Sequence, residues 1–155
     1  MKTSTKTLLA SASILILTVF HHFYAAAIFD TPWRRHVAII VMPVLLVMIV
    51  LYVLYQWRPM TLVGKTSLWL FMLVAVLVPI AWLGFYHGGY THLVKLILVF
   101  VGVPQATFER LCPVCEVPGD LVYEVTGVME FLFALFAAYY LFKLWLESRV
   151  EQRAI

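Results

Sequence analysis

Four long apolar stretches dominate this sequence, and each has the length of a membrane-crossing helix. They cover residues 8–27, 37–55, 68–86 and 121–146. A helix needs about 20 apolar residues to cross the hydrocarbon core of a bilayer. Lipid offers no hydrogen-bond partner to an open backbone group, so each stretch must be helical. The sequence therefore predicts an all-α membrane protein, a bundle of four transmembrane helices in one domain over residues 1–155.

The composition agrees with this prediction. Hydrophobic residues make up 64% of the chain and charged residues only 12%, which is about half the charged share of a soluble domain. Lipid accepts so many large apolar side chains, whereas a soluble core of this size has no room for them. No run of Lys and Arg is long enough to follow a phosphate backbone, which argues against nucleic-acid binding. The lipid bilayer is the expected partner.

A fifth apolar stretch, residues 93–103, is too short to cross a bilayer as a helix and contains Lys95. We expect an additional short helix here, between the third and fourth spans, that lies at the interface or re-enters the membrane. Residues 87–120 would then form a loop on the outer face. The alternative is that the stretch continues the third span past Gly88 and Gly89.

The basic residues predict the orientation. Alternation of the spans places seven Lys and Arg on the side of the termini and four on the other side. The positive-inside rule then puts both termini in the cytoplasm, and we expect the protein in a bacterial inner (plasma) membrane. Ala25-Ala26-Ala27 after the first span also resembles a signal-peptide cleavage site. We favour an uncleaved span, because the apolar region is long for a signal peptide.

All five histidines lie near the non-cytoplasmic face in this topology, and inverting the orientation would not separate them. The candidate metal ligands are these histidines and one acid of the fourth span: His21, His22, His36, His87, His92 and Glu124. Imidazole and carboxylate ligands suit zinc, copper or iron and do not decide between these transition metals. Isolated histidines also occur at interfaces without a function. Adjacent His21 and His22 point about 100° apart on a helix, so both reach one spot with difficulty.

The segment from His87 to His92 is the most suggestive part of this set. Gly88 and Gly89 relax the backbone between the two histidines, which would let both imidazoles reach one ion. The spacing matches no standard zinc pattern. The expectation of a metal site here therefore rests on residue types that lie close together rather than on a motif.

The only two cysteines form the motif Cys112-Pro113-Val114-Cys115. This spacing is typical of thiol–disulfide exchange and of half a metal site. A purely structural disulfide would close a very short loop and add little stability, so we take Cys112 and Cys115 as candidate catalytic residues. Four spans with an outward Cys-x-x-Cys resemble the plan of small four-helix disulfide-generating membrane enzymes. Those enzymes have a second cysteine pair to relay electrons, and this chain has none.

Glu130 is the third candidate catalytic residue. It lies ten residues after Asp120, the expected N-cap of the fourth span, and so roughly 15 Å into the membrane at 1.5 Å per residue. An ionisable group at that depth usually faces a bundle interior, a partner or a cavity. The alternative is that Glu130 hydrogen-bonds to a neighbouring helix and holds the bundle together.

Three functions are open from the sequence. The first is a membrane enzyme or redox protein with a His, carboxylate or Cys site on the non-cytoplasmic face. The second is a non-catalytic accessory subunit of a larger complex, bound to membrane-protein partners or to copies of itself. The third is a proton-coupled transporter or channel subunit that uses Glu130. The chain has no nucleotide-binding loop and no Ser-His-Asp order, so no motif decides whether it is an enzyme.

Overall fold

Helices make up nearly all of the computed structural model, which describes residues 1–115 and 119–153. Glu116, which directly follows Cys115 in the sequence, lies outside the described residues. The described part of the chain contains no strand. Along the chain the elements are α1 (Thr3–Ile28), η1 (Pro32–Arg35), α2 (His36–Trp57), α3 (Leu62–Ala75), η2 (Val76–Val94), α4 (Lys95–Phe100), α5 (Gln105–Leu111) and α6 (Leu121–Arg153).

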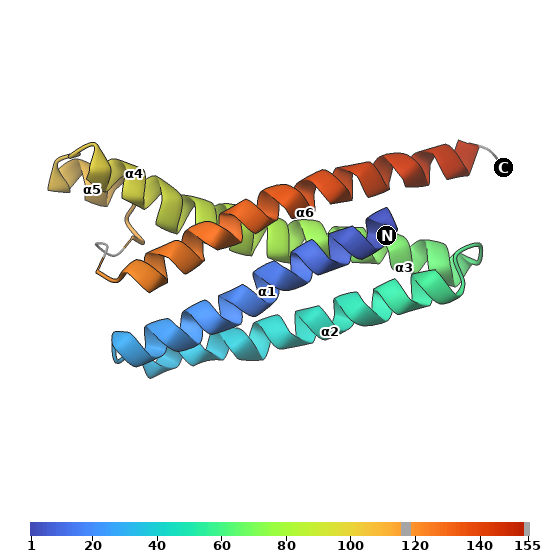
Figure 1. Ribbon diagram of the computed structural model, residues 1–155, viewed down its shortest axis with the longest axis horizontal. Coiled ribbons are helices and arrows are strands. Elements are labelled where there is room, and N and C mark those ends of the chain that lie inside the picture. The colour runs from blue at the N-terminus through green and yellow to red at the C-terminus, as the bar shows by residue number, and fades with distance from the viewer. Residues whose placement is uncertain (116–118, 154–155) are drawn as a thin grey trace.

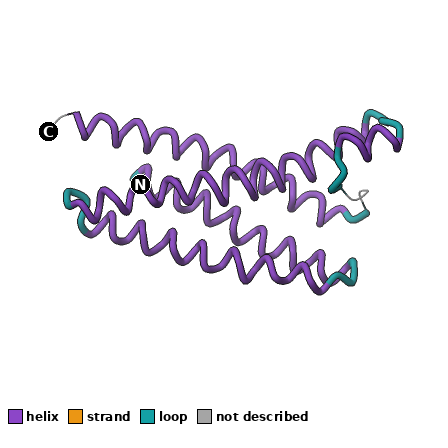
Figure 2. The backbone as a smooth tube through the Cα atoms, turned by 180° about the vertical axis from the view of Figure 1, so that it is seen from behind, coloured by secondary structure: helices purple, strands orange, loops and turns teal. Residues whose placement is uncertain are grey.

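Four helical stretches among the described residues are long and apolar enough to cross a membrane, as the sequence predicts. They are Thr3–Ile28, Pro32–Trp57, Leu62–Phe100 and Leu121–Val150. Figures 1 and 2 show them running along the molecule, with the loops towards its two ends. Both termini lie at one end, and the connection from α1 to α2 lies at the other.

The third helical stretch is longer than predicted. The expected end at Tyr86 and the separate short helix over residues 93–103 are both wrong, because α3, η2 and α4 form one helical stretch of 39 residues. Gly88 does not interrupt the helix because it packs directly on α6, where an added Cβ would lie 2.6 Å from the Gly127 carbonyl oxygen. The stretch ends at Phe100, and the turn that follows contains Gly102, whose φ of 70° suits glycine. The short helix α5 comes next.

The middle of this stretch, η2, is a π-helix of 19 residues. Its hydrogen bonds join residues five apart, and such helices are rare and often occur at functional sites. Pro79 lies near its start, and a proline offers no N–H for the α-helical pattern. The change of register brings side chains five residues apart onto neighbouring turns. His87 and His92 are such a pair.

Close packing of η2 on α6 positions this part of the bundle. An added Cβ at Gly84 would lie 2.1 Å from the Ala134 Cβ, and one at Gly127 would lie 2.3 Å from the His92 ring. Small residues let helix backbones approach closely where lipid supplies no hydrophobic driving force between helices. α1 packs against both α6 and η2, so the three elements meet around one buried region.

The start of α6 agrees with the sequence prediction. The Tyr123 backbone N–H donates to the Asp120 Oδ1 at 2.9 Å, which is the N-cap bond expected for Asp120. This cap starts α6 beside α1, since the Tyr24 hydroxyl also donates to Asp120 at 3.3 Å. The helix start that carries Glu124 and Thr126 is thereby held against the end of α1 that carries His21.

Candidate metal centre

Three histidines from two elements converge between α1, η2 and α6. His21 of α1 meets His87 and His92 of η2, and one potential ligand atom from each lies within 4.8 Å of the others. The ring centroids are 5.1 Å apart for His21–His87, 4.8 Å for His21–His92 and 5.1 Å for His87–His92. His21 and His92 are buried, and the His87 side chain is 18% exposed.

Each of the three imidazoles is held through its Nδ1 by a side chain of α6. His21 Nδ1 lies 2.8 Å from the Thr126 Oγ1, His87 Nδ1 lies 2.8 Å from the Glu130 Oε2, and His92 Nδ1 lies 2.9 Å from the Glu124 Oε2. An ionised carboxylate only accepts hydrogen bonds, so Nδ1 of His87 and His92 carries the proton when Glu130 and Glu124 are ionised. The other ring nitrogen, Nε2, then has a free lone pair.

The tautomer of His21 follows from the second bond of Thr126. The Thr126 hydroxyl donates to the Val122 carbonyl oxygen at 2.8 Å, so its lone pair accepts from the His21 Nδ1–H. The Tyr123 ring stacks on the His21 ring with centroids 4.3 Å apart and restricts its rotation. All three imidazoles are therefore oriented as metal-binding histidines usually are, with a fixed partner on one nitrogen and the other nitrogen free.

Several buried nitrogens of this cluster have no hydrogen-bond partner among the described residues. They are Nε2 of His21, Nε2 of His92 and Nδ1 of His22. Buried polar atoms in folded proteins are nearly always satisfied by protein, water or an ion. Two of these nitrogens belong to His21 and His92, members of the group whose ligand atoms could hold a metal ion.

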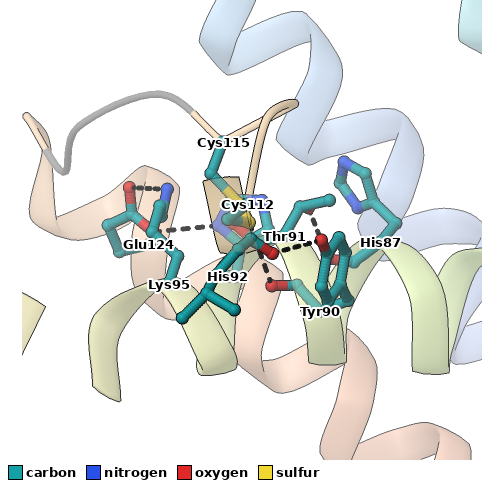
Figure 3. The surroundings of a disulfide bond; sticks show 9 residues. His87, Tyr90, Thr91, His92, Lys95, Cys112, Cys115 and Glu124 are labelled. Carbon is teal, nitrogen blue, oxygen red and sulfur yellow. Dashed lines mark hydrogen bonds and ion pairs between the residues drawn. A yellow bond between two sulfur atoms is a disulfide. The ribbon is translucent and has the colours of Figure 1, made fainter. Parts of the chain in front are cut away.

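Glu124 takes part as a positioning residue. Its Oε2 holds His92, and its Oε1 accepts from the Lys95 Nζ at 2.5 Å (Figure 3). Both oxygens are thus engaged, and the buried Lys95 cation compensates the carboxylate charge. Lys95 was seen in the sequence as a charge inside an apolar stretch, but its partner was not predicted. The pairing of Lys95 with Glu124 depends on α4 continuing directly from η2, which packs on α6.

Glu130 lies deeper in the bundle and is fully buried. Its Oε2 bonds to His87, which is a hydrogen bond between helices, one of the two alternatives that the sequence left open. The same bond places Glu130 beside the histidine cluster, which was not predicted. Among the described ion pairs, Glu130 is paired only with His87, whose ring is charged only when protonated. When it is ionised, this carboxylate would help to balance a metal cation beside His87.

The remaining candidate residues lie outside the three-histidine cluster. The His22 ring is 5.0 Å from the His87 ring, at the edge of the cluster. His36 is exposed, bonds to the Trp33 carbonyl oxygen and stacks on the Trp33 ring, and it is not part of the group of three histidines. Cys112 and Cys115 form a disulfide that lies beside the cluster rather than within it (Figure 3).

Thr126 positions His21, and the sequence did not predict this hydrogen bond. Its signal was its place beside Gly127, where the helices approach closely. Gly127 itself lies so close to the His92 ring that no side chain fits there. This contact fixes the distance between η2 and α6 at the level of the cluster.

The chain matches no protein-family model, no curated protein and no solved structure. The assignment of a function therefore rests on the geometry of the centre and on the chemistry of its residues.

Proposed function

We propose that this protein spans a membrane with its four long helices and binds one transition-metal ion through His21, His87 and His92. The observation that carries the proposal is the common arrangement of the three imidazoles. Each has its Nδ1 held by a side chain of α6, and their potential ligand atoms meet within 4.8 Å. An oriented set of free imidazole nitrogens in an apolar bundle is what a metal site requires.

The topology belongs to the same proposal. Four spans put both termini on one side, and the excess of Lys and Arg on that side favours the cytoplasm. The metal centre then lies in the non-cytoplasmic half of the bundle, in a bacterial inner membrane. The polar groups of the centre are tolerated at this depth because they face the interior of the bundle and one another.

An all-imidazole ligand set suits zinc, copper or iron. Three protein ligands leave a fourth position for water or a small ligand, which is typical of catalytic and exchangeable sites rather than of closed structural ones. Glu130 would balance part of the charge of the ion, since the charge of Glu124 is already compensated by Lys95. The protein would supply a dry, shaped cavity around a metal that polarises the bound ligand.

Metal content is the test of this proposal. Protein purified in mild detergent from cells grown with zinc, copper and iron should contain one of these metals at about one ion per chain, measured by mass spectrometry. His21→Ala and His92→Ala should each lose most of it. His36→Ala is the matched control and should retain it, because His36 lies outside the cluster. Wild-type protein that neither contains nor takes up any of the three metals would overturn the proposal.

A further inference from the structure

The Cys112–Cys115 disulfide lies against the part of η2 that carries two of the three proposed ligands (Figure 3). Cys112 Sγ is 3.9 Å from the Tyr90 carbonyl oxygen, and Cys115 Sγ is 3.8 Å from the Thr91 carbonyl oxygen. Tyr90 and Thr91 lie between His87 and His92 in the chain. The disulfide therefore contacts the backbone whose path sets the distance between two ligands.

A second contact ties the same two segments together. The Tyr90 hydroxyl donates to the Leu111 carbonyl oxygen at 2.6 Å, directly before Cys112. The Thr91 hydroxyl in turn donates to the His87 carbonyl oxygen at 2.6 Å. The cysteine loop is thus joined to η2 at residues 90 and 91. A change in the loop is transmitted to the turn between the two histidines.

We propose that Cys112 and Cys115 form a thiol–disulfide exchange site whose redox state controls how fast the metal centre exchanges its ion. This inference rests on the proposed metal-binding function. The partner is an external dithiol, such as a reduced protein with its own cysteine pair. The role of the cysteines is then to control the metal centre, which needs no second cysteine pair to relay electrons.

The exchange begins at Cys115. Cys112 is only 1% exposed, whereas Cys115 is partly exposed, and exchange depends on access to the sulfur. A thiolate of the dithiol attacks the Cys115 Sγ, the bond between the two sulfurs breaks, and Cys112 leaves as a thiolate that takes up a proton. The partner's second thiolate then attacks the partner's first sulfur, which is bonded to Cys115 in the mixed disulfide. This step releases Cys115 as a thiolate, which takes up a second proton. Two electrons pass to the cysteine pair, and the partner becomes a disulfide.

Reduction affects the metal centre through the register of η2. In an α-helix, residues five apart point about 140° away from each other, whereas the π register brings His87 and His92 together. A long π-helix is an uncommon conformation that depends on its surroundings. Opening the disulfide breaks the covalent link that holds the loop of residues 112–115 against Tyr90 and Thr91. The turn between the histidines is then freer to adopt α-helical register, which moves one ligand away from the ion.

The rate of metal release tests this inference. Oxidised protein loaded with zinc is mixed with an excess of a colorimetric chelator, and the same protein is measured after reduction by a phosphine. We expect release to be about tenfold faster or more after reduction, the scale of effects seen when the support of a ligand is lost. The variant Cys112→Ser/Cys115→Ser should release zinc at the fast rate with or without the phosphine, which controls for direct effects of the reductant.

The outcomes separate the inference from the function on which it rests. Equal release rates for the oxidised protein, the reduced protein and the double variant would overturn the redox control and leave the metal site standing. Oxidised protein that binds no zinc, copper or iron would overturn the proposed function and the inference with it. Because the reduced wild-type protein is measured as well, the test holds even if the double variant folds poorly.

Discussion

The ring centroids of His87 and His92 lie 5.1 Å apart although the two residues are five positions apart in one helix. In α-helical register they would point to different sides. The π-helix η2 brings them to one side, and α6 holds each through a carboxylate, Glu130 for His87 and Glu124 for His92.

The space beside Gly127 sets the position of His92. A Cβ at residue 127 would lie 2.3 Å from the His92 ring, so Gly127→Ala should push the imidazole out of place. We expect the affinity for metal to fall by about 10- to 100-fold, measured by competition with a chelator. Gly84→Ala is the matched control, because its Cβ would overlap Ala134 instead. Both variants should lose stability by about 1–3 kcal/mol, but only Gly127→Ala should lose affinity. Equal affinities for metal in Gly127→Ala and Gly84→Ala would contradict this role of Gly127.

The charge of Glu130 should matter separately from its hydrogen bond. Glu130→Gln keeps an oxygen that accepts from the His87 Nδ1–H but removes the negative charge beside the proposed ion. We expect a loss of affinity of about 10- to 100-fold, measured by metal titration of the apo protein. Glu147→Gln is the control, since Glu147 is exposed and bonds to Thr3 at the far end of the bundle. An unchanged affinity in Glu130→Gln would show that the carboxylate serves only to join the helices.

Lys95 and Glu124 should behave as a coupled pair. Lys95→Met leaves the buried Glu124 carboxylate without its cation, and breaking a buried ion pair in this way costs about 3–5 kcal/mol. We expect a lower free energy of unfolding in detergent for Lys95→Met. The double variant Lys95→Met/Glu124→Gln should recover part of the loss, because no uncompensated charge remains. Strict additivity of the two single changes would count against the coupling.

The proposed topology predicts on which side of the membrane a fused reporter protein will lie. A fluorescent protein that matures only in the cytoplasm should be fluorescent when fused after Arg153 and dark when fused after Thr31, between the first two spans. Whole-cell fluorescence at equal expression, measured by immunoblot, checks the result. The opposite pattern would invert the orientation and place the histidine centre on the cytoplasmic side. Fluorescence from both fusions would contradict the three membrane crossings proposed between the two fusion points.

The candidate site was predictable from the sequence only in part. The apolar spans and the Asp120 cap were visible, because length, apolarity and capping are local properties. The end of the third helix was misplaced, because Gly88 and Gly89 read locally as a break. In the structure both glycines are buried, and an added Cβ at Gly88 would lie 2.6 Å from the Gly127 carbonyl oxygen. A glycine that breaks a helix in isolation permits close packing when another helix lies against it.

The sequence by itself determined four apolar helices and, through their alternation, five histidines towards one end of the bundle. Length and hydrophobicity along the chain are enough for that. Only the tertiary structure decided that His21, His87 and His92 meet, that His36 stays at the surface, and that Glu124 and Glu130 bond to Nδ1 atoms. The rotation of each helix and the π register of η2 depend on contacts between distant residues, such as Gly127 with His92. No local pattern in the chain encodes those contacts.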